Sequence, residues 1–145
     1  MVCFGVPKGE RTSYKTWEES DVVPSVVIEI SSRGTWSKDR VEERLLYEML
    51  GVEEYFIFNP LYPKNSSSLL AFRRTSNEFE SLNIENERVK SETLNLDLVV
   101  SGRSLRLWNP QTNEFLKTSG ELAEENTELK AEIERLKKLL GNNQN

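Results

Sequence analysis

The feature that most constrains this chain is an apolar run over residues 23–32 that contains a single carboxylate, Glu29. Its Val and Ile content, with Pro24 at one end and a Ser- and Gly-containing cluster at the other, predicts a strand buried on both faces. An ionised carboxylate in such a strand costs several kcal/mol unless it is paired or binds a metal. Two interpretations of Glu29 follow: a metal ligand, or a buried ion-pair member whose partner is Arg33 or Arg44.

A helix and a second apolar strand follow this run. The helix is predicted over residues 38–50, with Gly51 where a C-terminal cap belongs. One face of the helix collects the apolar residues Val41, Leu45, Leu46 and Met49. The second strand is predicted over residues 54–58. Strand–helix–strand order predicts a right-handed crossover between two parallel strands.

The second half of the chain changes to short segments in which apolar and polar residues alternate between Asn, Ser and Gly turns. Strands are predicted there over residues 69–73, 78–82, 88–92 and 104–108. This pattern is typical of an antiparallel meander. Residues 2–4 are predicted as one more strand at the start of the chain. The fold class is therefore α/β: a mixed sheet with a flanking helix, an antiparallel β extension and a C-terminal helix.

The C-terminal segment has the most regular pattern in the sequence. Leucines recur every seven residues at Leu122, Leu129 and Leu136, and the interleaved positions are Asn126, Ile133 and Leu140. With the leucines at heptad position d, Asn126 takes an a position, where a polar residue fixes the register of parallel dimers. Glu125 then faces Lys130 of a second copy, and Glu132 faces Lys137. The pattern favours a coiled-coil homodimer, and the alternative is one amphipathic helix packed on its own domain.

The composition restricts the chemistry. The chain has no His and one Cys, Cys3, which excludes His-based catalysis, His metal sites and internal disulfides. Catalysis would rest on other polar residues, with an oxygen-ligated cation such as Mg²⁺. The lone cysteine favours a cytoplasmic setting, and no apolar run approaches the roughly 18 residues of a membrane helix, so no membrane partner is predicted. The net charge of −5 argues against a strong nonspecific nucleic-acid binder.

Several segments, taken in order, carry a family resemblance. They are Phe4-Gly5-Val6-Pro7-Lys8, Pro24 with Val26-Val27-Ile28-Glu29-Ile30-Ser31, Thr35-Trp36-Ser37-Lys38-Asp39, Tyr47, Gly51-Val52-Glu53-Glu54-Tyr55-Phe56-Ile57-Phe58-Asn59-Pro60, and Ser104-Leu105-Arg106-Leu107-Trp108-Asn109-Pro110. Their order and spacing resemble a bacterial family of restriction-endonuclease-like proteins in the PD-(D/E)XK nuclease superfamily. The resemblance runs from Val2 to the C-terminal helix.

The resemblance implies a Mg²⁺-dependent DNA phosphodiester hydrolase. In that superfamily an Asp on one strand and a Glu on the next hold the metal, and a nearby Lys helps to activate the attacking water. Two converging carboxylates suit a hard cation, which polarises the phosphate and lowers the pKa of bound water. Glu29 corresponds to the Glu of that motif, as catalytic residue and Mg²⁺ ligand, and DNA is the implied partner.

The chain departs from the family pattern in three ways. The strand with the metal-binding Asp is expected upstream of Met1, so the chain looks N-terminally truncated, with an exposed sheet edge beside residues 2–4. Ser25 stands where the family has Asp after the proline, on the same strand side as Glu29. Glu43 stands where the family has Lys. The nearby cations that could substitute for that Lys are Lys38, Arg40 and Arg44.

These departures predict a weak or inactive nuclease with an incomplete active site. The alternative is a non-catalytic homodimeric interaction protein, or an inactive nuclease remnant. Three segments follow from the sequence: a partial restriction-endonuclease-like domain over residues 1–118, a coiled-coil helix over residues 119–141, and a disordered tail over residues 142–145.

Overall fold

The apolar run around Glu29 forms strand β1 (Val26–Ile30), as predicted. It pairs in parallel with β2 (Glu54–Phe58), and Glu29 lies opposite Ile57 in the register. The computed structural model that shows this pairing describes residues 1–7, 9–10, 12–31, 39–61 and 67–142. The parallel pairing across an intervening helix confirms the strand–helix–strand prediction.

The helix between these strands ends where the sequence indicates. A π-helical segment, η2 (Asp39–Glu43), leads into α2 (Arg44–Leu50). Gly51 closes the helix with a φ of 89°, a left-handed conformation that favours glycine, and its N–H donates to the carbonyl of Glu48 (3.2 Å). Lys38, the predicted first residue of the helix, lies outside the described residues.

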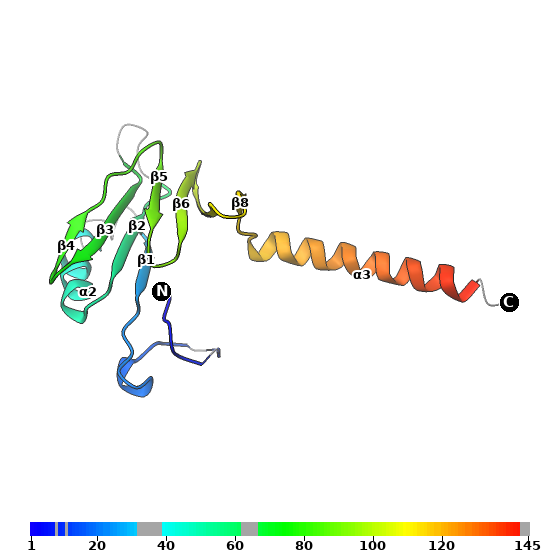
Figure 1. Cartoon of the computed structure of the whole chain (residues 1–145), viewed down its shortest axis with the longest axis horizontal. Helices are drawn as coiled ribbons and strands as arrows, with labels where there is room; N and C mark the ends of the chain where they lie inside the picture. Colours follow the sequence, from blue (N-terminus) through cyan, green and yellow to red (C-terminus); the bar gives the residue numbers. More distant parts are fainter. Residues whose placement is uncertain (8, 11, 32–38, 62–66, 143–145) are drawn as a thin grey trace. The chain divides into compact units, whose positions relative to one another are not determined.

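The first sheet has the strand order β1-β2-β3-β4 (Figure 1). Strands β3 (Leu69–Thr75) and β4 (Glu78–Ser81) continue it with antiparallel pairing. The predicted strand at the start of the chain is reduced to a single bridge, in which Val2 pairs with Val26 at the outer side of β1. Gly5, with a φ of 81°, then bends the chain. A 3-10 turn, η1 (Thr16–Glu18), precedes β1.

The predicted meander is divided between two sheets. Its first two strands are β3 and β4, whereas the remaining strands form a second sheet with the order β5-β6-β7-β8. These are β5 (Arg88–Ser91), β6 (Leu96–Ser101), β7 (Ser104–Asn109) and β8 (Glu114–Phe115). The strands predicted around residues 88–92 and 104–108 are confirmed. Strands β6 and β8 were not predicted.

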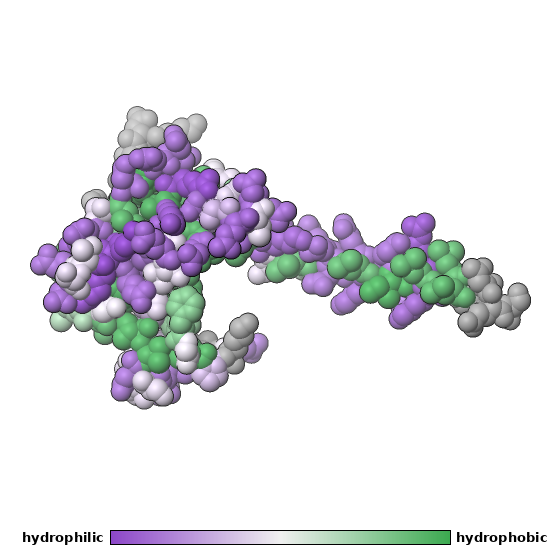
Figure 2. All heavy atoms as spheres, viewed as in Figure 1, coloured by the Kyte–Doolittle hydropathy of each residue, from purple (hydrophilic) through white to green (hydrophobic). Residues whose placement is uncertain are grey.

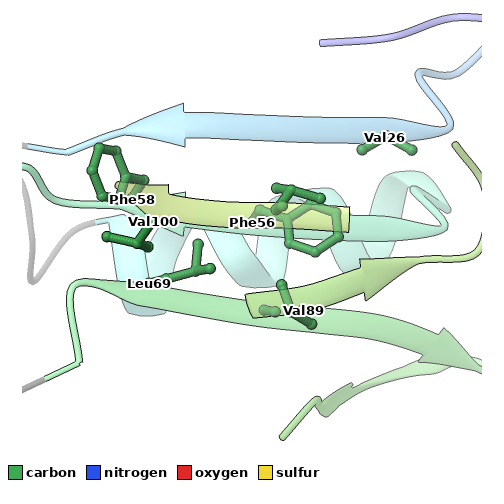
Figure 3. Close-up of a cluster of buried hydrophobic side chains, with 8 residues drawn as sticks. Val26, Phe56, Phe58, Leu69, Val89 and Val100 are labelled. Atoms are coloured by element: carbon green, nitrogen blue, oxygen red, sulfur yellow. The ribbon is translucent and has the colours of Figure 1, made fainter. Parts of the chain in front are cut away.

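The two sheets pack face to face over the main hydrophobic core. Val26, Phe56, Phe58 and Leu69 extend from the first sheet towards Val89 and Val100 of the second (Figure 3). Alternate residues of β1, β2 and β3 point to this core because side chains along a strand alternate between faces. The residues of the first sheet named here are all buried by this packing.

The opposite face of the first sheet carries α2 and a second cluster of buried residues. Val27, Val52, Tyr55, Ile57, Phe72 and Phe79 form that cluster, with Tyr47 packed against it. The apolar face of the helix does not take part. Val41, Leu45, Leu46, Met49 and Leu50 are all exposed, Met49 to 85%.

Burial along β1 also differs from the sequence prediction. Val26 and Val27 are buried, but Glu29 is only half-buried and Ile30 is 64% exposed. The prediction that this strand is buried on both faces is therefore wrong for its C-terminal half. A half-buried carboxylate keeps part of its hydration, so Glu29 does not need a cation to be tolerated.

Contacts divide the chain into two compact units, Met1–Glu114 and Phe115–Asn145. The second unit contains α3 (Ser119–Asn142). A capping box begins this helix: the N–H of Glu121 donates to Oγ1 of Thr118 (3.2 Å), and the N–H of Thr118 donates to Oε2 of Glu121 (2.6 Å). Within the described residues, no helix combines the length and apolarity needed to cross a membrane.

Candidate functional site

Glu29 lies near the end of β1, on the face of the first sheet that carries α2. Its Oε1 accepts a hydrogen bond from the hydroxyl of Tyr47 (2.9 Å). The two residues are 18 positions apart, and the parallel crossover brings them together because α2 returns across the sheet. Since Glu29 is half-buried, one side of its carboxylate is oriented by the protein while the group stays accessible to solvent.

Aromatic contacts hold Tyr47 in this position. Its ring centroid is 5.0 Å from that of Tyr55, and Tyr55 is 6.2 Å from both Phe72 and Phe79. These distances are in the range of favourable aromatic pairs. The same side chain therefore packs in the aromatic cluster and donates a hydrogen bond to Glu29.

The ion-pair interpretation of Glu29 gains no support from the described residues. Arg33 lies outside them. The guanidinium of Arg44 lies over the ring of Phe72, 5.6 Å from its centroid, and no ion pair between Arg44 and Glu29 occurs in the described part of the chain. Tyr47 is the polar partner of Glu29 within that part.

The ligand set expected of a metal site is not assembled around Glu29. No group of three or more His, Cys, Asp or Glu residues suited to a metal occurs among the residues that the structure describes. The stretches outside them contain no Asp, Glu, His or Cys, but the side chain of Asp39 also lies outside the described part. Proteins usually hold Mg²⁺ through one or two carboxylates together with substrate oxygens, so Glu29 by itself would provide the minimum of protein ligands.

The two substituted positions of the family pattern differ in their relation to Glu29. Ser25 stands four residues earlier, and its carbonyl accepts the N–H groups of Glu53 and Glu54 (3.0 and 3.1 Å). Four residues of strand span about 13 Å, so an Asp at position 25 would not share one ion with Glu29. Glu43 is four residues before Tyr47, a spacing that places both on the same side of a helix. Lys38 and the side chain of Arg40 lie outside the described part of the structure.

Asn59, which the sequence analysis did not single out, is a further polar group on this face. It follows β2 directly and is 1% exposed. Its Oδ1 accepts the N–H of Leu61 (2.9 Å), whereas its buried Nδ2 has no hydrogen-bond partner among the described residues. Strand alternation from Ile57 to Asn59 keeps it on the Glu29 side, about 8 Å away between Cα atoms. A buried donor without a partner is a candidate for contact with a ligand.

Comparison with known proteins identifies the family. A model of the Uma2 family, described as "Putative restriction endonuclease", matches residues 1–107. The chain belongs to the Uma2 family. Neither the solved structures nor the curated proteins include a match to it. The match confirms the restriction-endonuclease-like resemblance and the mixed α/β fold predicted from the sequence.

A second carboxylate of this Uma2 chain, Glu54, was missed by the sequence analysis. It is 0% exposed, at the first position of β2. The Nε of Arg73 lies 3.0 Å from its Oε1, the N–H of Glu92 donates to the same oxygen (3.0 Å), and the hydroxyl of Ser91 donates to Oε2. The signal was present, because Glu54 begins an apolar strand just as Glu29 interrupts one.

The Glu54 network joins the two sheets. Arg73 belongs to β3 of the first sheet, and it also donates to the carbonyl of Lys90 (3.1 Å) and lies 3.1 Å from the carboxylate of Glu92. Ser91 belongs to β5 of the second sheet. Every partner named here satisfies the buried charge, so Glu54 is a structural residue.

Proposed function

We propose that this chain is a restriction-endonuclease-like protein that keeps the Glu29 position of a Mg²⁺-dependent DNA phosphodiester hydrolase but not a complete metal site. Its cleavage of DNA is therefore weak or absent. The observation that carries the proposal is the environment of Glu29: an accessible carboxylate, oriented by Tyr47, that belongs to no group of three or more metal-ligating residues among those the structure describes.

The coordination chemistry of Mg²⁺ supports the proposal that DNA cleavage is weak. Mg²⁺ dehydrates reluctantly and demands near-octahedral oxygen ligands, so a single carboxylate leaves most of the coordination to water. The negative charge of Glu43 stands where the family has a Lys, which removes the cation expected to orient the attacking water. DNA as substrate follows from the family description of the Uma2 match.

The first test is Mg²⁺ binding measured by titration calorimetry on the full chain and on Glu29→Gln. We expect no saturable binding in the sub-millimolar range for either protein, together with weak or absent cleavage of plasmid DNA in Mg²⁺ or Mn²⁺. Saturable sub-millimolar binding that Glu29→Gln abolishes would overturn the proposal of an incomplete site.

A variant that is expected to gain Mg²⁺ binding tests the same proposal through a positive result. Asn59→Asp adds a carboxylate on the neighbouring strand and keeps the oxygen that accepts the N–H of Leu61. We expect this variant to bind Mg²⁺ more tightly than the parent chain, and the gain to disappear when Glu29→Gln is added. If Asn59→Asp gains nothing, Glu29 is not the surviving half of a metal site.

The chain supplies a matched control for this variant. Asn109 also precedes a proline, and its Oδ1 accepts the N–H of Gln111 (2.9 Å), as that of Asn59 accepts the N–H of Leu61. Asn109→Asp adds the same charge in the same type of turn, at the end of β7. We expect it to leave Mg²⁺ binding unchanged, which separates a site at Glu29 from a general effect of charge.

A second candidate function is a non-catalytic homodimeric interaction protein. The observation that favours it is the exposed apolar side of α3, which includes Leu129 at 55% exposure. Under this alternative, Glu29→Gln changes neither Mg²⁺ binding nor any DNA-dependent property, whereas disruption of α3 removes self-association.

A further inference from the structure

We propose that α3 is a self-association element that pairs in parallel with α3 of a second copy of this chain. The helix carries a continuous apolar stripe along its length, flanked by hydrophilic side chains (Figure 2). The exposed fractions along this stripe are Leu122 45%, Leu129 55%, Ile133 50%, Leu136 49% and Leu140 69%. Such a stripe is costly to leave in water and marks an interaction surface.

The helix is continuous along the stripe, and its start is fixed by a cap. The capping box of Thr118 and Glu121 defines the N-terminal end of the helix. Residues Ser119–Asn142 form one unbroken helix. Leucines therefore occupy three successive d positions, and Ile133 and Leu140 occupy a positions, as a two-stranded seam requires. The narrow stripe fits one partner helix.

The charges beside the stripe select a second copy as that partner. Positions g hold Glu125 and Glu132, and the e positions five residues later hold Lys130 and Lys137. In a parallel homodimer each g position faces the following e position of the other chain, so both types of contact are attractive and each occurs twice.

An antiparallel homodimer would instead juxtapose like charges. In that arrangement g faces g and e faces e, which brings Glu against Glu and Lys against Lys. The pattern therefore opposes the antiparallel alternative. In the single chain, Glu125 pairs with Lys117 (2.6 Å), but both side chains are about half exposed, so exchanging this pair for Lys130 of a second copy costs little.

Asn126 provides the register. It lies at an a position and is exposed in the single chain. In a parallel pair, it meets Asn126 of the second copy in the middle of an apolar seam. Any shift in register would bury the amide against Leu or Ile, so the aligned arrangement is favoured at a cost in stability. The helix spans fewer than four heptads, so association is weak and depends on concentration.

The test measures the mass of the full chain by analytical ultracentrifugation over a series of concentrations. We expect the mass to rise from that of one chain, 16.8 kDa, towards twice this value. Leu129→Asp should weaken association by at least about 100-fold, because each copy would bury an unpaired carboxylate in the seam. The control, Ala131→Asp, adds the same charge to the outer face of the same helix and should leave association unchanged.

Each outcome decides the proposal. A mass that stays at one chain up to the highest soluble concentration overturns it. Equal effects of Leu129→Asp and Ala131→Asp would also overturn it, because the stripe would then have no special role. Circular dichroism of both variants at low concentration checks that the first unit keeps its β-sheet signal, so loss of association is not confused with unfolding.

Orientation has its own test. Ser119→Cys in a Cys3→Ser background places one thiol at the N-terminal end of each helix. In a parallel pair the two thiols lie within disulfide distance, whereas in an antiparallel pair they lie roughly 30 Å apart. We expect a covalent dimer on mild oxidation, and its absence in a chain that still dimerises overturns the parallel arrangement. Asn126→Leu should tighten association and add species of higher mass, and an unchanged oligomer would contradict the register role.

Discussion

Glu54 and Glu29 lie on opposite faces of the first sheet, and they differ in how completely the protein surrounds them. On the face towards the second sheet, Phe56 and Glu54 are 0% exposed, and Glu54 is held by partners from both sheets. On the face towards α2, Glu29 is half-buried and has Tyr47 as its polar partner within the described part.

The comparison shows why only one of these carboxylates is a candidate for function. A fully buried charge must be satisfied by the protein itself, and burial also keeps a ligand from reaching it. A half-buried carboxylate retains solvent on one side and can exchange that solvent for a ligand. The closed surroundings of Glu54 therefore supply stability, and the open surroundings of Glu29 supply access.

The largest loss of stability is expected from removing the buried carboxylate of Glu54. Glu54→Ala removes the acceptor of Arg73 and Ser91, and we expect a loss of about 4 kcal/mol in the free energy of unfolding, measured with urea. The control is Glu92→Ala, which removes the exposed partner of Arg73 and should cost less than about 1 kcal/mol. Similar losses for the two variants would contradict the structural role of Glu54.

The next effect concerns the apolar core between the sheets. Leu98 on β6 is 0% exposed, and Leu98→Ala should lower the free energy of unfolding by about 3 kcal/mol through lost contacts and a residual cavity. The same denaturation measurement applies. A loss below about 1 kcal/mol would show that the two sheets are not tightly packed in solution.

A smaller loss of stability is expected from removing the hydrogen bond between Tyr47 and Glu29. Tyr47→Phe removes one hydrogen bond and keeps the aromatic packing, so we expect a loss of about 1 kcal/mol. In a Glu29→Leu background, the same substitution should cost almost nothing, because the acceptor is already absent. Additive costs in this double-mutant cycle would contradict a direct bond between Tyr47 and Glu29.

The smallest effect tests the exposed side of α2. Leu46→Ala makes the same chemical change as Leu98→Ala, but Leu46 is 51% exposed, and Ala favours a helix. We expect a change below about 0.5 kcal/mol in the free energy of unfolding. A loss as large as that of Leu98→Ala would mean that this side of the helix is covered in solution.

Local sequence pattern was sufficient for most of the secondary structure. Alternation and apolar runs located β1, β2, β3, β4, β5 and β7, and Gly51 located the end of α2. Strand β6 was missed although it is apolar and turn residues flank it, with Asn95 on one side and Gly102 on the other. One of its residues, Asp97, is 9% exposed and accepts a hydrogen bond from Arg88 (2.7 Å), a contact that no local pattern encodes.

The orientation of α2 shows what pattern alone does not give. Apolar periodicity identified one face of the helix, but the opposite face contacts the sheet through specific polar groups. Tyr47 donates to Glu29, Arg74 donates to the carbonyl of Glu48, and the carboxylate of Glu48 accepts the N–H of Phe79 (2.5 Å). These partners lie 18 to 31 residues apart, so they depend on the pairing of strands that the sequence does not specify locally. Glu29 as candidate residue was predictable, whereas Tyr47 and Asn59 as its neighbours were not.

The link between Glu54 and Ser91 also sets an order of events while the chain is being made. The two residues are separated by 37 positions, which a ribosome adding 5–20 residues per second takes about 2 to 7 s to cover. Until Ser91 is made, Glu54 lacks its partners near the second sheet, although Arg73 of the first sheet is already present. The set of contacts that satisfies this buried charge is therefore complete only after the first strand of the second sheet has been synthesised.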